Sequence, residues 1–179
     1  MRSKRIIYMF FICFTLGLVI LANCCSSQAC VGNVFTAHVV RVIDGDTISV
    51  RDMAGGVHRI RLAMIDAPEK AQPYGEEATK SLEEFLQGRI VRLKIKCIDK
   101  YNREVAFVHC DDKDVSAEML RQGMAMHYHI KFEDCALYDS IQKQAKKEKL
   151  GLWQSENIET PWNYRHRQKM MQEEGARTC

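Results

Sequence analysis

Three separated stretches of the chain carry charged side chains in patterns that could do chemistry. The first is Asp44-Gly45-Asp46, in which two carboxylates bracket a glycine at an expected turn between strands. Because glycine lets the backbone bend tightly, the carboxylates at this turn can converge. Taken alone, the same pattern is also typical of an ordinary solvent-exposed hairpin.

The second stretch runs from Arg61 through Asp66 to Glu69. If it is a strand of period two, Arg61 shares a face with Ala63 and Ile65. A charge within an apolar strand needs an opposite charge or an anionic ligand. Carboxylates at the strand end are hard oxygen donors of the kind that calcium prefers. The alternative is an internal ion pair between Arg61 and one of these carboxylates.

The third stretch is Asp99-Lys100-Tyr101-Asn102-Arg103, which presents several polar groups on one turn. A hairpin tip exposed to solvent is the ordinary interpretation of such a turn. Only its combination with the first two stretches suggests a site.

Alternating strands and a few helices must position these stretches. Periodicity two, with turn residues between the runs, predicts strands over residues 34–43, 47–51, 57–65, 89–98 and 104–110. Helical spacing predicts helices over residues 75–87, 115–122 and 133–150, with Asp114 as a candidate cap of the second. Five short strands with a helix between the third and fourth predict a mainly β fold. We expect a five-stranded Greek-key barrel of the oligonucleotide/oligosaccharide-binding (OB) type with about three α-helices.

The first 29 residues have the composition of an export segment. Residues 1–5 are cationic, residues 6–22 form an uncharged and largely apolar run, and Ser27-Gln28-Ala29 provides small residues before a cleavage point. The alternatives are an uncleaved membrane anchor through residues 6–22 and a lipidated Cys24. All three place the protein outside the cytoplasm, as a secreted, periplasmic or envelope-anchored protein.

The remaining chain divides into a domain over residues 30–154 and a polar tail over residues 155–179. The formal charge of +3 comes from Arg2, Lys4 and Arg5, and basic and acidic residues balance from Cys30 onward. Net charge therefore does not indicate a nucleic-acid partner, and any such function has to come from a local site.

Together the three stretches resemble the staphylococcal nuclease family, also called the thermonuclease family. The resemblance covers residues 39–153 and extends beyond the three stretches to the blocks at residues 74–78, 121–125 and 145–153. Six blocks in the same order make it specific. It implies a calcium-dependent endonuclease that hydrolyses DNA and RNA and leaves 3′-phosphates.

The resemblance also implies roles for individual residues. Asp46 and Asp66 would bind Ca²⁺ through their carboxylates, and Ala67 through its main-chain carbonyl. Many relatives have threonine at the place of Ala67. Glu69 would activate the attacking water.

Arg61 and Arg103 would bind the phosphate. Asn102 replaces the usual glycine, at a place that asks for a left-handed backbone, which asparagine tolerates. Lys100, Tyr101 and Tyr128 would contact substrate, and Tyr128 is the aromatic residue available for base stacking. Beyond Ca²⁺, no other cofactor is expected, and the chain is expected to act as a monomer.

The main alternative function is a non-catalytic module that binds nucleic acid on the same barrel. It would not require the full set of Arg61, Glu69 and Arg103, all of which are present. A structural calcium-binding envelope protein is a more distant alternative, which would need the carboxylates but not both arginines.

Three further features have ordinary interpretations. His127 and His129 could bind metal, but without a cysteine or carboxylate placed convincingly by the sequence they are interpreted as polar surface. Cys97 and Cys110 fit either disulfides or buried thiols equally well. The basic residues of the tail could contact nucleic acid or anionic lipid, although basic tails are often simply flexible.

Overall fold

The computed structural model describes residues 32–129 and 135–177. The predicted export segment lies outside the described residues, as do the first two residues of the helix predicted over 133–150. Among the described helices, none is both long and apolar enough to cross a membrane.

Five long strands form the barrel that the sequence predicts. They are β1 (Val34–Asp44), β2 (Thr47–Asp52), β3 (Val57–Leu62), β5 (Ile90–Ile98) and β6 (Glu104–Cys110). Neighbouring strands are antiparallel in the order β3-β2-β1-β5-β6, and a parallel pairing of β3 with β6 closes the sheet on itself. The predicted mainly β, five-stranded Greek-key OB-fold barrel is confirmed.

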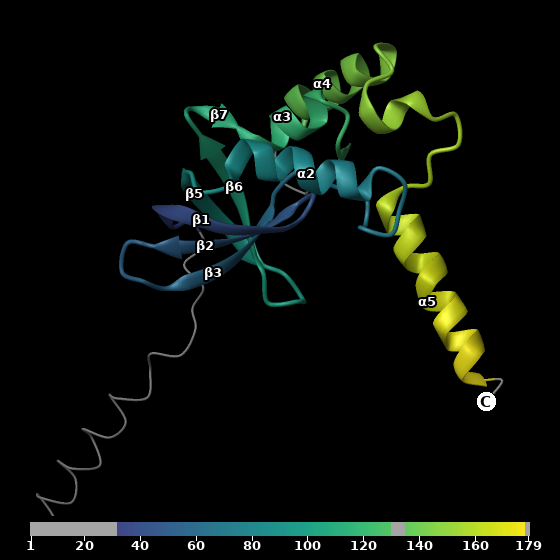
Figure 1. Ribbon diagram of the computed structural model, residues 1–179, viewed down its shortest axis with the longest axis horizontal. Coiled ribbons are helices and arrows are strands. Elements are labelled where there is room, and N and C mark those ends of the chain that lie inside the picture. The colour runs from purple at the N-terminus through teal and green to yellow at the C-terminus, as the bar shows by residue number, and fades with distance from the viewer. Residues whose placement is uncertain (1–31, 130–134, 178–179) are drawn as a thin grey trace, which may run out of the picture. The chain divides into compact units, whose positions relative to one another are not determined.

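Within residues 32–129 and 135–177, four α-helices and several short elements accompany the barrel (Figure 1). The helices are α2 (Gly75–Leu86), α3 (Val115–Arg121), α4 (Ala136–Lys147) and α5 (Pro161–Arg177). The short strands are β4 (Ile65–Asp66), β7 (Lys113–Asp114) and β8 (Met126–His127), and a 3-10 turn η1 spans Gly151–Gln154. The predicted cap of α3 is present, because the Asp114 side chain accepts a hydrogen bond from the amide of Ala117 at 3.1 Å.

The core lies inside the barrel and beneath α2. Ile48, Ile60 and Leu93 point inward from three strands and are fully buried. On α2, Leu82 and Leu86 lie at helical spacing and are buried against the same core. Burial of large aliphatic side chains stabilises the fold by about 1.5–3 kcal/mol each. The alternating apolar residues of the strands and the apolar stripe of α2, both visible in the sequence, therefore pack together in one core.

The predicted third strand is too long. It ends at Leu62, and Met64 adopts a left-handed backbone with φ of 69° before β4 starts. The turn is held from three sides: Ala63 N–H donates to Ala106 O at 2.8 Å, Ser116 Oγ donates to Ala63 O at 2.7 Å, and Tyr128 N–H donates to Met64 O at 2.8 Å. These partners come from distant segments, so local alternation could not reveal the break.

The polar tail contains a helix. For residues 161–179 the sequence leaves a peripheral helix and disorder as alternatives, and the structure shows the helix α5 over Pro161–Arg177. Tyr164 Oη donates to Ala71 O at 3.4 Å, and Gln72 Nε2 donates to Glu159 O. These contacts place the start of α5 beside the segment that follows β4.

Two cysteines can be assigned as thiols. Cys110 is buried, which agrees with the buried-thiol alternative. Cys97 is exposed, so the buried-thiol alternative is wrong for Cys97. Neither forms a disulfide with another described residue.

His58 joins three strands close to the seam where β3 meets β6. Its Nε2 lies 3.0 Å from Asp52 Oδ2 on β2, and its Nδ1 lies 3.0 Å from Glu104 Oε2 on β6. Partial burial lowers the pKa of His58, but the two carboxylates raise it more, so the net pKa lies above its ordinary value.

This pairing predicts a pH-dependent stability. Because the pKa is raised on folding, the stabilisation by His58 is complete below the unfolded pKa of about 6.5 and is lost as pH rises through the folded pKa. We expect a loss of up to about 1 kcal/mol, since the pair is partly exposed. Urea unfolding of full-length protein at a series of pH values measures it. His58→Gln should remove this slope, whereas His38→Gln, at an exposed position of β1, should keep it.

Candidate active site

The candidate site forms at one end of the barrel, where three segments meet. Thr47 at the start of β2 pairs with Arg61 on β3, and Arg61 pairs with Val105 of β6. Arg103 immediately precedes β6, and Asp66 ends β4. Ladder register alone therefore brings the three charged stretches of the sequence together.

Gly45 permits this assembly by its lack of a side chain. A Cβ at this position would lie 2.8 Å from the Cβ atoms of both Ala67 and Ala78, closer than real contacts allow. Gly45 does not have a positive φ, so the turn itself does not require the conformational freedom of glycine. The glycine is needed so that the β1–β2 turn can approach the segment after β4 and the helix α2.

Arg61 is the hub of the site. Its Nη2 lies 2.7 Å from Asp66 Oδ1 and 3.1 Å from Asp46 Oδ2, and its Nη1 donates to Ile65 O at 3.1 Å. The Arg61 side chain points away from the core, since Ile60 and Leu62 on either side of it are the buried residues of β3. The internal ion pair, which the sequence offers as the alternative interpretation of Arg61, is therefore present, and it involves two carboxylates that face the same small volume.

Arg103 is oriented by Asp99 and Thr47, neither of which has an individual role in the sequence-based prediction. Its Nε donates to Asp99 Oδ2 at 2.8 Å, and its Nη1 donates to Thr47 Oγ1 at 3.2 Å. Thr47 Oγ1 in turn donates to Asp46 Oδ1 at 2.8 Å. This chain of hydrogen bonds ties Arg103 to the carboxylate pair around Arg61.

The turn before Arg103 has the backbone that the sequence predicts. Asn102 has φ of 59°, as expected for an asparagine that replaces glycine at a left-handed position. Burial raises the pKa of Asp99, but hydrogen bonds from the main chain and side chain of Arg103 lower it more, so its pKa lies below the ordinary value. Asp99 is therefore ionised at neutral pH and fixes Arg103 in place.

Glu69 lies on the segment between β4 and α2 and is partly exposed. Its carbonyl oxygen is so close to Gly75 that a Cβ there would lie within 1.9 Å of it. The main-chain amide of Gln72 also donates to Glu69 O, at 2.8 Å. The main chain around Glu69 is therefore held tightly, while its carboxylate faces the site.

An unexpected third arginine lies between Glu69 and Asp66. Arg165, from α5, places Nη1 2.8 Å from Glu69 Oε1 and Nη2 2.7 Å from Asp66 Oδ2. In the sequence, Arg165 is one of the basic residues of the tail, for which contact with nucleic acid or anionic lipid and simple flexibility are the alternatives. No local pattern could identify it, because its partners are 96 and 99 residues away.

Two exposed aromatic rings lie beside the first two arginines. The Tyr128 ring centroid is 5.9 Å from Arg61 Cζ, and the Tyr101 centroid is 5.5 Å from Arg103 Cζ. Lys100 Nζ lies 5.0 Å from the Tyr101 centroid. Exposed rings at this spacing offer surfaces on which bases can stack. All three predicted substrate contacts are thus adjacent to the arginines.

The carboxylates of the site are crowded and partly or fully buried. Burial raises the pKa of Asp44 to about 6, and the negative charge of Asp46 adds to the effect. Burial also raises the pKa of Asp66, and the hydrogen bonds and charges of Arg165 and Arg61 only partly offset it. The cluster therefore has an unfavourable excess of buried negative charge, which additional positive charge would relieve.

These residues fit a hard divalent cation. Asp46 and Asp66 supply carboxylate oxygens that converge at Arg61 Nη2, and the amide nitrogen of Ala67 lies 3.5 Å from Asp46 Oδ2. The ligand atoms that the two carboxylates offer to a cation are oxygen atoms, which calcium and magnesium prefer. Because Arg165 pairs with Asp66, it competes for the same carboxylate as such a cation.

Comparison with known proteins identifies relatives of this chain. The model of a family described as staphylococcal nuclease homologue matches residues 59–155. An uncharacterized endonuclease of Haemophilus influenzae is 34% identical over 143 residues, which cover 80% of this chain and 80% of the relative. An uncharacterized endonuclease of Escherichia coli O157:H7 is 38% identical over 130 residues, covering 72% and 84% respectively. A micrococcal nuclease of Shigella flexneri is 34% identical over 146 residues, covering 75% and 83%.

The position of Arg165 predicts that its removal strengthens cation binding. Arg165→Gln takes away a positive charge that lies 2.7 Å from Asp66 Oδ2. Since Arg165 is partly exposed, solvent screens this charge, and we expect a gain of about 1 kcal/mol, or roughly fivefold in Kd. Calorimetric titration of full-length protein with CaCl₂ measures the change. The control is Arg167→Gln on the same helix, whose partner is Glu159. Equal effects of the two variants would contradict the competition.

Proposed function

Because the chain belongs to the staphylococcal nuclease family, we propose that it is a calcium-dependent nuclease that hydrolyses DNA and RNA and releases 3′-phosphate products. Its relatives are named as nucleases and endonucleases, so nucleic-acid hydrolysis is the general activity of this chain. The observation that carries the finer proposal is the convergence of Arg61, Asp46 and Asp66 at one point, with Arg103 connected to them through Thr47.

The two arginines suit the charge that develops during phosphodiester cleavage. Negative charge builds on the equatorial oxygens of the phosphate in the transition state, and guanidinium groups offer paired donors that stay protonated. In this role Arg61 and Arg103 hold the phosphate between β3 and the turn before β6. Asp99 and Thr47 fix the direction of Arg103, so that little reorganisation is needed when substrate binds.

Glu69 is the group that accepts the proton of the attacking water. Its carboxylate is partly exposed, so water can reach it, and its main chain is held by the tight contact with Gly75. In the structure Arg165 pairs with this carboxylate, so the pair must separate before Glu69 can act as a base.

Asp46, Asp66 and the main-chain carbonyl of Ala67 would hold the calcium ion. When bound, calcium polarises the phosphate and favours deprotonation of water at neutral pH. Asp46 and Asp66 would hold the ion beside Arg61, and its positive charge would relieve the repulsion between the two carboxylates.

The surroundings of the site suit a polyanionic substrate. A pocket of about 420 Å³ lies beside Glu69 and is lined by three basic residues, Lys70, Arg165 and Lys169. Tyr101 and Tyr128 provide stacking surfaces next to the two phosphate-binding arginines. The alternative of a non-catalytic binding module explains the aromatic and basic residues but not the buried carboxylates beside Arg61.

Loss of single site residues should remove most of the activity. Arg61→Ala and Arg103→Ala each take away a donor to the transition state, and we expect a rate about 10²–10³ lower. Glu69→Gln takes away the proton acceptor, and we expect a loss of about 10²–10⁴. Cleavage of fluorescent DNA and RNA by full-length protein, with CaCl₂ and with a chelator, measures these rates.

Matched controls separate catalysis from folding in this assay. Arg59→Ala changes an exposed arginine of the same strand, and Glu76→Gln changes an exposed glutamate of α2; both should keep near-normal rates. Since Arg61 pairs with buried carboxylates, thermal unfolding of each variant accompanies the assay. Folded variants that cleave as fast as the parent, or parent activity that persists in chelator, would overturn the proposal.

Export of the protein forms part of the proposal. The composition of residues 1–29 supports a cleaved secretory signal, and the exported chain is proposed to act as a monomer. Mass spectrometry of protein from a native-type host should show a mature chain that begins at Cys30. An intact Met1 would instead show an anchor through residues 6–22, and a lipid-modified Cys24 would show lipidation.

A further inference from the structure

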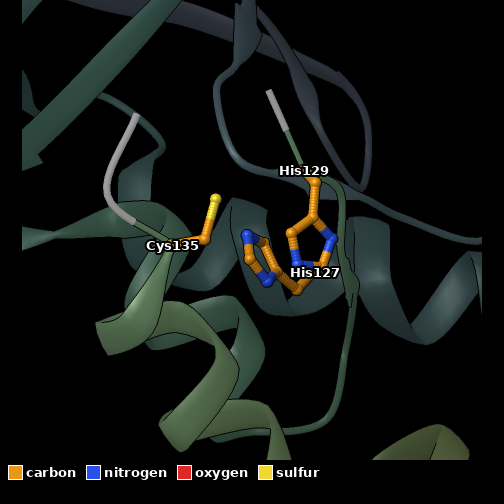
Figure 2. A group of neighbouring side chains, drawn as sticks. All are labelled: His127, His129 and Cys135. Atoms are coloured by element: carbon orange, nitrogen blue, oxygen red, sulfur yellow. The ribbon is translucent and has the colours of Figure 1, made fainter. Parts of the chain in front are cut away.

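We propose that His127, His129 and Cys135 form a binding site for a transition-metal ion of the zinc type. Figure 2 shows the two imidazole rings and the thiol gathered around one point beside α4. The three side chains offer ligand atoms that all lie within 4.8 Å of one another. Nitrogen and sulfur donors of this kind select zinc and related metals over calcium, which prefers oxygen.

The distances leave little rearrangement for binding. Zinc binds histidine nitrogen at about 2.0–2.1 Å and cysteine sulfur at about 2.3 Å, so ligands of one tetrahedral ion lie roughly 3.3–3.8 Å apart. The present separations of up to 4.8 Å therefore require movements of roughly 1 Å. His129 is exposed and can make such a movement without disturbing the core.

A buried lone pair on His127 points to a missing ligand. The His127 side chain is fully buried, and its Nδ1 lies 2.9 Å from Asp139 Oδ1. An ionised carboxylate only accepts hydrogen bonds, so Nδ1 carries the proton and Nε2 carries the lone pair. Within the described residues His127 Nε2 has no hydrogen-bond partner. A buried polar atom in this state is unfavourable, and a bound metal ion would remove that penalty.

Asp139 occupies the position of a supporting carboxylate. Histidines that bind metals usually donate their second nitrogen to a carboxylate, which fixes the ring and makes the ligating nitrogen more basic. His129 Nε2 also lies near Asp139, 3.4 Å from the same Oδ1. The rings of the two histidines have centroids 4.2 Å apart. One carboxylate therefore orients both imidazoles.

Cys135 supplies the sulfur atom of the proposed site. It is the residue at the N-terminal cap of α4, a helix of 12 residues, and it is partly buried against the core. Cysteine binds metal ions through its sulfur, and the position at the start of α4 directs this sulfur toward the two histidines. Three protein ligands with an exposed side at His129 leave a fourth coordination position for water.

The sequence-based interpretation of the histidines is therefore wrong for His127. It expected polar surface because no cysteine or carboxylate was convincingly placed, yet His127 is buried and His129 alone is exposed. The fold of α4 against α3 brings Cys135 and Asp139 to the histidines. A shared site of this kind depends on tertiary packing and is not visible in residue spacing.

The proposed metal site would stabilise the strand that carries Asp66. His127 belongs to β8, which pairs with β4: His127 lies opposite Ile65, and Met126 lies opposite Asp66. Tyr128, the next residue, is beside Arg61. A metal ion that fixes β8 to α4 would thus fix the strand that carries Asp66.

Cobalt substitution tests the proposal directly. Full-length protein, stripped of metal by chelator and dialysis, is titrated with CoCl₂ in excess CaCl₂ while its absorption spectrum is recorded. We expect one equivalent of cobalt to give a thiolate charge-transfer band and the visible bands of tetrahedral cobalt, and ZnCl₂ to displace it.

Variants assign the bands to the proposed ligands. Cys135→Ser should abolish the thiolate band, and His129→Gln, at an exposed position, should weaken cobalt binding at least about tenfold. Asp139→Asn should weaken it about 10–100-fold while the thiolate band persists. Cys97→Ser, which changes an exposed thiol of β5, is the control and should leave the spectrum unchanged. Absence of tetrahedral cobalt bands in the parent protein, or a band that survives in Cys135→Ser, would overturn the proposal.

Discussion

The buried carboxylate of Asp66 is the constraint on which the site depends. Its side chain is 1% exposed, and a carboxylate without a cationic partner in such a place would be strongly unfavourable. Arg61 and Arg165 provide that partner from positions far apart in the sequence. In the proposed function a divalent cation would compete with these arginines for Asp66, so that cation binding, charge balance and local stability would be linked at one residue.

The barrel satisfies this constraint through register. Parallel pairing of β3 with β6 places Arg61 beside Val105, two residues after Arg103. Antiparallel pairing of β2 with β3 places Thr47 beside Arg61. A closed sheet leaves no freedom to slide one strand without breaking the others, because a one-residue shift would turn each buried face outward. The fold thereby fixes charged groups that come from three distant stretches.

The sequence predicts the parts of this arrangement that depend on local pattern. Alternation around Ile48 and Ile60 identifies the strands, and the stripe through Leu82 identifies α2. The six ordered blocks place Asp46 and Arg61 in one site. Local pattern fails where distant groups decide the structure. The turn at Met64 is held by residues from three other segments, and Arg165 reaches Asp66 across 99 residues.

The two proposed metal sites are connected by the short ladder of β4 and β8. Oxygen donors of Asp66 face the arginines, whereas His127, across β4 and β8, faces α4 with an unpartnered lone pair among the described residues. Hard and soft donors select different ions, so each site can fill without competing for the other's metal. Because the main chain of two strands connects them, an ion bound at His127 would restrict the movement of Asp66. Asp66 would then already be ordered before calcium binds, so calcium binding would lose less conformational entropy. In this way a rigid support would increase the affinity for calcium without adding a contact to it.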